Sequence, residues 1–208
     1  ITGDGNDSVL LSDVNVNITA RDRTVDRFVD LGAGDDKLDC GQSYLGQGDY
    51  HLLAIAGDGS DTLNIVGGYG EIDTGSGNDS VSIATTASSE NGSYSVSLGE
   101  GDDTIISSSA NVSITAGSGS DVVNLSSGGT IAGGQGNDEL FLGTGTYRLQ
   151  FGRGDGMDQI NAADPSSQLR IELAPGIQVS DVAWDLGSDG QVVLRILGTN
   201  DGMVFGFA

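Results

Sequence analysis

The chain has 208 residues, including 35 glycines and only two prolines, so it favours short strands and tight turns over long helices. Its 30 acidic residues stand against 8 basic ones, and the formal net charge is -22. That charge argues against binding to nucleic acid or to an anionic membrane, and it strains a compact fold unless cations neutralise it. The single cysteine, Cys40, excludes an internal disulfide framework and disfavours a zinc site, and no apolar run reaches membrane-spanning length.

One motif, Gly-x-Gly-x-Asp, recurs along the chain. Its eight copies span residues 3–7, 32–36, 57–61, 75–79, 99–103, 117–121, 134–138 and 154–158, and their starts lie 29, 25, 18, 24, 18, 17 and 20 residues apart. After each Asp the sequence alternates apolar and polar residues, as in Ser80–Ile83, which predicts a half-buried strand. A second such strand, for example Val112–Thr115, precedes the next motif.

Each interval therefore predicts one coil of a solenoid, made of a motif turn, a strand, an opposite turn and a returning strand. The fold class predicted is all-β, a right-handed parallel β-roll or β-helix with a C-terminal antiparallel β cap. Opposite turns without the Asp motif are expected at residues 66–70, 84–92, 107–111, 126–129 and 143–145, and these turns should hold the extra residues of the longer intervals. Residues 8–31 and 39–56 fit the repeat least well.

The repeat stops near Asp164, which divides the chain into a predicted β-roll at 1–160 and a capping segment at 161–208. Four strands are expected in the cap, at residues 169–173, 181–186, 191–197 and 203–207. Asp189-Gly190 and Asp201-Gly202 mark tight antiparallel hairpins between them. Such a sheet, with Trp184, would cover the last apolar layer of the roll. No signal peptide pattern opens the chain and Thr2-Gly3 begins a motif at once, so we expect it to come from a longer array.

The motif turns suit calcium, which takes six to eight oxygen ligands and accepts backbone carbonyls as well as carboxylates. Alternate glycines let successive carbonyls converge, and the closing Asp adds charge. Stacking at about 4.8 Å would let one carboxylate bridge two cations, so several Ca²⁺ ions are expected in one ladder. The predicted metal ligands are Asp7, Asp36, Gly57, Gly59, Asp61, Gly75, Gly77, Asn78, Asp79, Gly99, Gly101, Asp102, Asp103, Gly117, Gly119, Ser120, Asp121, Gly134, Gly136, Asn137, Asp138, Gly154, Gly156 and Asp158.

The turns GSGNDSVSI, GSGSDVVNL and GQGNDELFL resemble the RTX nonapeptide, glycine-glycine-x-glycine-x-aspartate-x-apolar-x, of type I secreted bacterial proteins. Residues 133–138 match in full, whereas the other copies lack the first glycine, a mild loss if that position offers only a carbonyl. Residues 147–160, YRLQFGRGDGMDQI, resemble the haemolysin-type calcium-binding related segment found near such arrays. One departure is the doubled spacing, which leaves one edge of the roll without aspartates.

The resemblance implies a domain that stays unfolded in the low-calcium cytosol, leaves through a type I secretion apparatus and folds in extracellular calcium. It would be a non-catalytic, secreted module of a larger bacterial toxin, adhesin or exoenzyme.

Three other functions receive less support. A polysaccharide-active parallel β-helix enzyme, a lyase or epimerase, needs a base and charge neutralisers gathered on one face. The arginines are instead dispersed at positions 21, 23, 27, 148, 153, 170 and 195. An adhesive or ice-binding face would show regular Thr ladders, but the threonines at 62, 85, 104, 115 and 130 keep no common phase. Arg153-Gly154-Asp155 spells the integrin-binding tripeptide, although the last motif already explains its glycine and acid.

Overall fold

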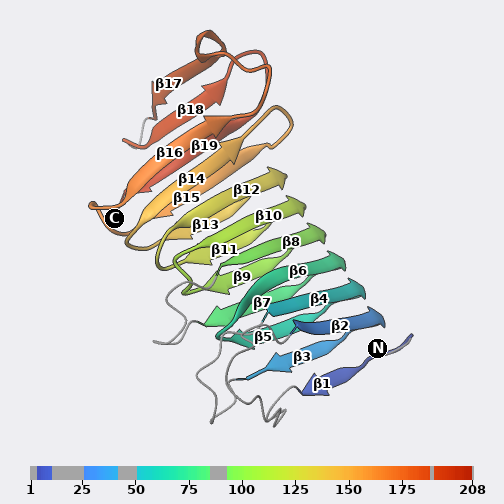
Figure 1. Ribbon diagram of the computed structural model, residues 1–208. Coiled ribbons are helices and arrows are strands. Elements are labelled where there is room, and N and C mark those ends of the chain that lie inside the picture. The colour runs from blue at the N-terminus through green and yellow to red at the C-terminus, as the bar shows by residue number, and fades with distance from the viewer. Residues whose placement is uncertain (1–3, 11–25, 42–50, 85–92, 188–189, 208) are drawn as a thin grey trace.

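The computed structural model describes residues 4–10, 26–41, 51–84, 93–187 and 190–207. Two sheets face each other along one axis, and the chain alternates between them from β1 to β17 (Figure 1). In the part of the chain described, no helix combines the length and apolar character needed to span a membrane.

The larger sheet has 11 strands. In spatial order they are β1 (Ser8–Leu10), β3 (Lys37–Cys40), β5 (Thr62–Val66), β7 (Ser80–Ala84), β9 (Thr104–Ser107), β11 (Val122–Leu125), β13 (Glu139–Leu142), β15 (Met157–Ala162), β19 (Gly202–Phe207), β18 (Val192–Ile196) and β17 (Val182–Leu186). The smaller sheet has 8 strands, namely β16 (Gln168–Leu173), β14 (Thr146–Phe151), β12 (Gly129–Gln135), β10 (Val112–Ser118), β8 (Tyr94–Glu100), β6 (Tyr69–Ser76), β4 (His51–Asp58) and β2 (Asp26–Ala33). A short 3-10 helix, η1, spans Val179–Asp181.

The predicted coil is confirmed, because consecutive strands up to β16 alternate between the sheets and each pairs in parallel with the strand one coil away. Equivalent residues stack in register, as Gly99, Gly117 and Gly134 do. β2 and β4 keep this register too, so the described parts of residues 8–31 and 39–56 follow the repeat, whereas 11–25 and 42–50 lie outside the described residues. The extra residues of the three longest intervals fall in sequence between β1 and β2, β3 and β4, and β7 and β8, as expected.

The core lies between the two sheets and takes alternate residues from each strand. Val123, Leu125 and Leu149 are fully buried, while their sequence neighbours face outward. At the edge opposite the motifs, the buried Tyr147 hydroxyl donates to the Leu125 carbonyl oxygen at 2.9 Å, and Tyr94 donates in the same way to Gly67 at 2.6 Å. The opposite edge is therefore closed by hydroxyl-to-carbonyl bonds at these points.

Stacking requires glycine at the motif turns for two reasons. Gly119 has a φ of +133°, a conformation that side chains disfavour. In addition, a Cβ at Gly119 would lie 2.0 Å from the carbonyl oxygen of Gly101 in the coil below. Gly154, in the last motif, also has a positive φ of +91°, but a Cβ there would meet no atom within 4 Å. Gly119 is therefore required by both backbone conformation and packing, whereas Gly154 is required by backbone conformation alone.

The C-terminal segment forms strands where they were expected, but only three of the four are antiparallel partners. β17, β18 and β19 form the antiparallel part, and β19 joins it to the roll by pairing in parallel with β15. β16 instead pairs in parallel with β14 and continues the smaller sheet, because the chain completes one more return before it leaves the repeat. The expectation of a purely antiparallel four-stranded cap is therefore wrong for β16.

Trp184 does not cover the last apolar layer as expected. It lies on β17, at the edge of the sheet, and is 59% exposed, with its ring centroid 5.9 Å from that of Phe205. The apolar residues buried in the cap lie on the two strands closer to the roll: Val193, Leu194 and Ile196 on β18, and Met203 and Phe205 on β19.

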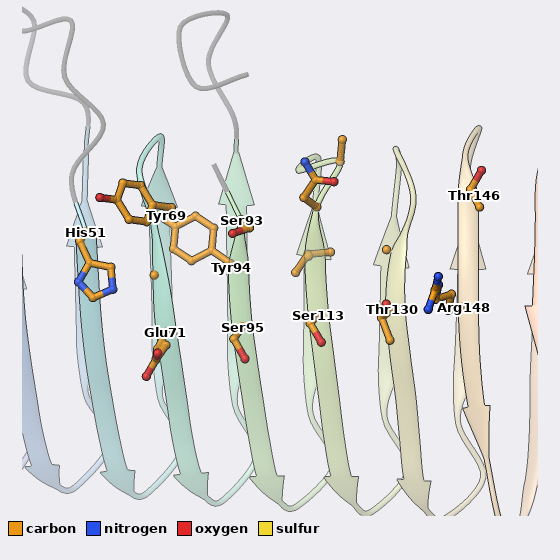
Figure 2. Close-up of a pocket in the computed structure, with 15 residues that line it drawn as sticks. His51, Tyr69, Glu71, Ser93, Tyr94, Ser95, Ser113, Thr130, Thr146 and Arg148 are labelled. Carbon is orange, nitrogen blue, oxygen red and sulfur yellow. The ribbon is translucent and has the colours of Figure 1, made fainter. Parts of the chain in front are cut away.

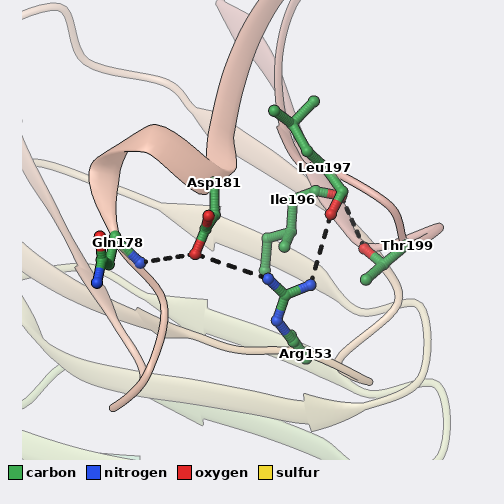
Figure 3. Close-up of polar contacts among 6 residues, drawn as sticks. All are labelled: Arg153, Gln178, Asp181, Ile196, Leu197 and Thr199. Carbon is green, nitrogen blue, oxygen red and sulfur yellow. Dashed lines mark hydrogen bonds and ion pairs between the residues drawn. The ribbon is translucent and has the colours of Figure 1, made fainter.

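Polar contacts fasten the cap to the last motif turn. The Asp201 carboxylate accepts the N–H groups of Gly154 and Gly156 at 2.9 and 3.1 Å. Figure 3 shows the Arg153 guanidinium between η1 and the β18–β19 turn, 3.7 Å from the Asp181 carboxylate and donating to the Leu197 carbonyl oxygen at 3.5 Å.

Replacing Gly119 by alanine should destabilise the fold far more than replacing Gly154. We expect a loss of about 3 kcal/mol or more for Gly119→Ala, because strain and backbone overlap add, and about 1 kcal/mol for Gly154→Ala, which has conformational strain alone. Urea unfolding of the two variants and the parent, under one condition in which all are folded, measures the difference. Equal losses would show that the close approach between coils is unimportant.

Removing the Asp201 carboxylate should loosen the cap. Asp201→Ala leaves two backbone N–H groups without their acceptor, and we expect a cost of about 1–3 kcal/mol. Asp185→Ala is the matched control, because it removes an exposed carboxylate of the cap that forms an ion pair with Arg195 at 3.1 Å, and it should cost under about 1 kcal/mol. A larger effect at Asp185 in urea unfolding would contradict this account of the cap.

Candidate metal-binding edge

The closing aspartates of the motifs form one continuous ladder along an edge of the roll. Oδ1 of each Asp accepts the backbone N–H of the motif Asp in the preceding coil, over distances from 2.5 Å for Asp36 to 3.1 Å for Asp158. The seven side chains that accept these bonds are at most 3% exposed, and they belong to Asp36, Asp61, Asp79, Asp103, Asp121, Asp138 and Asp158. Asp7 is half-buried and begins the ladder by donating its N–H to Asp36.

A second, exposed ladder lies one residue earlier in each motif and runs in the opposite direction. There the side chain of one coil accepts the N–H of the following coil: Asn78 accepts from Asp102 at 2.9 Å, and Asp102 accepts from Ser120 at 2.7 Å. Asn6, Asp35 and Asn137 accept in the same way. Each turn is consequently tied to both neighbours by side-chain acceptors.

Most aspartates of the buried ladder have one carboxylate oxygen without a hydrogen bond. Oδ2 is buried and has no hydrogen-bond partner among the described residues in six aspartates: Asp36, Asp61, Asp79, Asp103, Asp121 and Asp138. A buried ionised carboxylate without compensation is costly, and here the same group is repeated at the strand spacing of about 4.8 Å. The ladder therefore needs either protons or cations.

Burial shifts the titration of the ladder strongly. Burial, opposed by the backbone N–H bond and reinforced by neighbouring carboxylates, raises the pKa of Asp103 to about 7 and that of Asp158 to about 8. Burial likewise raises the pKa of Asp61, Asp121 and Asp138 to about 6 each, and it also raises the pKa of Asp79. Near neutral pH the ladder therefore holds protons that exposed aspartates would have lost.

The structure brings the predicted ligands together on one edge but divides them between two environments. Seven of the predicted aspartates form the buried ladder: Asp36, Asp61, Asp79, Asp103, Asp121, Asp138 and Asp158. Asn78, Asp102, Ser120 and Asn137 belong to the exposed one. The glycines all have positive φ, and they are Gly57, Gly59, Gly75, Gly77, Gly99, Gly101, Gly117, Gly119, Gly134, Gly136, Gly154 and Gly156.

Carboxylates alone do not complete a metal site here. Within the described ranges, no three His, Cys, Asp or Glu side chains gather as a group of ligands. A cation at this edge would therefore combine the free Oδ2 of an aspartate with backbone carbonyls of the turns. Those carbonyls lie close to the backbone of the next coil, since the Gly99 carbonyl oxygen would be 2.0 Å from a Cβ added at Gly117.

The structure also explains why most motifs lack the first glycine of the nonapeptide. The residue before the first motif glycine is buried in the core in five coils, where it is Leu31, Ala56, Thr74, Leu98 or Ala116. Only Gly133 has no side chain there, and a Cβ at Gly133 would lie 2.2 Å from Oδ2 of Asp138. The position thus serves core packing, a role that the sequence pattern alone does not reveal.

Asp201 is a residue whose role at this edge sequence reasoning missed. The Asp201-Gly202 pair predicts only a hairpin, yet the Asp201 side chain binds the last motif turn. Although burial acts in the other direction, the N–H groups of Gly154 and Gly156 hold the pKa of Asp201 below its ordinary value. One step further, Met203 stands in register with Asp158, where a further coil would place an Asp.

In comparisons with known proteins, no protein-family model matches the chain, and no curated protein is similar to it.

Acid should stabilise the metal-free fold. An unfolded Asp has a pKa near 3.9, so between about pH 4 and pH 8 the folded ladder binds more protons than the unfolded chain. This contribution is fully present below about pH 4 and is lost as the pH rises through 6 to 8. Circular dichroism in metal-free buffer should show more β structure at pH 5 than at pH 8. β structure that increases with pH would contradict the shifted ladder.

Proposed function

We propose that the motif edge binds calcium ions and that the domain is a calcium-binding β-roll module that folds when calcium is supplied. One observation carries the proposal: six buried carboxylate oxygens, stacked along one edge, have no hydrogen-bond partner among the described residues. Cations placed among them would remove the cost of burying like charges at the strand spacing.

The ligands would be the Oδ2 atoms of the buried ladder together with carbonyl oxygens of the motif turns. Oδ1 is already an acceptor for the preceding coil, so each aspartate keeps its structural hydrogen bond while Oδ2 takes the ion. An all-oxygen set of carboxylates and carbonyls suits calcium, which tolerates flexible geometry, better than magnesium, which retains water and demands an octahedron. Bound calcium would supply the charge neutralisation and the cross-links between coils.

The net charge of -22 supports the coupling of metal binding to folding. Without cations, collapse brings the ladder carboxylates together against their repulsion, whereas the extended chain keeps them apart. This behaviour would suit a module that crosses a type I secretion apparatus unfolded and folds outside the cell. A secreted bacterial toxin, adhesin or exoenzyme as the parent protein rests on the resemblance of the repeats to RTX nonapeptides.

A polysaccharide lyase or epimerase is less well supported by the geometry. Glu71 and Arg148, which line a groove on the smaller sheet, lie on β6 and β14. The two strands are four places apart, which corresponds to about 19 Å, so these two groups cannot act on the same bond.

Calcium should convert the chain from a poorly ordered state to the β-roll at pH 8. We expect β structure to increase with half-saturation at about 10⁻⁴ to 10⁻³ M Ca²⁺, the range of extracellular modules, and to be restored far less by magnesium or by matched sodium chloride. Asp121→Asn should raise the calcium concentration needed, because it removes one ladder carboxylate. Asp73→Asn removes the same charge from the exposed face of β6 and should leave that concentration unchanged.

Circular dichroism titrations of the three proteins measure this. Identical spectra in metal-free buffer and in calcium would overturn the coupling to folding, and equal shifts for the two variants would show that net charge, rather than the ladder, responds to calcium.

A further inference from the structure

A groove of about 580 Å³ crosses the outer face of the smaller sheet and is separate from the motif edge. Figure 2 shows the side chains that line it arranged across successive strands, from His51 on β4 to Arg148 on β14. The proposed calcium function makes no use of this groove.

Strand register sets the groove side chains in two rows. One row runs through Glu71, Ser95, Ser113, Thr130 and Arg148, which face one another on β6, β8, β10, β12 and β14. These side chains point outward, because the residues on either side of them, such as Ile114 next to Ser113, are in the core. Neighbouring strands lie about 4.8 Å apart, so the row presents three hydroxyl groups at regular intervals between one carboxylate and one guanidinium.

The other row begins with an aromatic pair. His51 and Tyr69 are paired across β4 and β6, and their ring centroids are 5.3 Å apart at an interplanar angle of 46°. Tyr69 is half-exposed and lies two residues before Glu71 on β6, at the same end of the groove. The groove therefore offers ring surface at one end and hydrogen-bonding hydroxyls along its length.

We propose that this groove binds an extended neutral glycan lying across the strands. The apolar C–H face of a pyranose ring packs on an aromatic ring, and its hydroxyls both donate to and accept from serine and threonine. The strand spacing is close to the rise of one sugar residue in an extended chain, so successive residues would meet Ser95, Ser113 and Thr130 in turn. Glu71 would accept hydrogen bonds from sugar hydroxyls near the aromatic end.

Charge favours a neutral chain over an acidic one. The domain carries a net charge of -22, which repels polyanions. Glu71 is in the groove itself, and Arg148, at the far end, already contacts Glu172 at 3.4 Å.

The test is isothermal titration calorimetry of the folded chain with the hexasaccharides of four neutral glycans: cellohexaose, mannohexaose, xylohexaose and maltohexaose. We expect saturable binding of at least one of them. Tyr69→Ala should weaken it on the order of tenfold, because the ring contact is lost. Ser113→Trp should abolish it by filling the middle of the groove. Phe141→Ala is the matched control, since it removes an exposed aromatic ring from the larger sheet and should leave the affinity unchanged.

Circular dichroism under the same conditions confirms that each variant is folded. The proposal is overturned if none of the four hexasaccharides binds, or if Tyr69→Ala and Ser113→Trp bind as tightly as the parent. Tighter binding of hexagalacturonate than of every neutral chain would overturn the neutral class. None of these results depends on whether calcium or another condition brings about folding.

Discussion

In-register stacking of equivalent residues governs this domain. Parallel coils place each residue directly over its equivalent, so whatever one coil does is repeated at the strand spacing. For core residues such as Val123 and Leu140 this repetition is favourable, because apolar side chains pack on their like. For the motif aspartates it is unfavourable, because carboxylates that are at most 3% exposed are stacked on carboxylates. The need for protons or cations at this edge follows from the same geometry that builds the core.

The hydrogen bonds of the motif edge explain how such a ladder can still hold its shape. The buried aspartates accept bonds from the coil before, and the exposed Asn and Asp side chains accept bonds from the coil after. Side-chain hydrogen bonds thus tie each turn to the coil before it and to the coil after it. These bonds do not depend on what neutralises the charge. The structural use of Oδ1 leaves Oδ2 as the part of each carboxylate that must be compensated.

Much of this architecture could be predicted from the sequence, because the repeat reports its own register. The spacing of the motifs predicted the strands and placed the closing aspartates on one shared edge, and the Asp-Gly pairs predicted the antiparallel strands. The roles of β16 and Trp184 could not be predicted in the same way, since both depend on where the last coil closes against the cap. The groove could not be predicted from the sequence for a related reason. Glu71, Ser113 and Arg148 are far apart in sequence and lie in one row only because of the register of five strands.

At the end of the ladder, the stack stops without adding another buried carboxylate and without leaving the N–H groups of the last turn unpaired. A further coil would place an aspartate over Asp158, but Met203 occupies that place and is buried, so no new carboxylate is added to the stack. The N–H groups of Gly154 and Gly156 would then lack a partner in the next coil. The side chain of Asp201, two residues before Met203, accepts both of these hydrogen bonds. Because Asp201 binds two donors, its charge is compensated by hydrogen bonds, unlike the charges of the ladder below. The cap thus ends the ladder of carboxylates and also satisfies the N–H groups of the last motif turn, while β19 continues the sheet of β15 in the same parallel register.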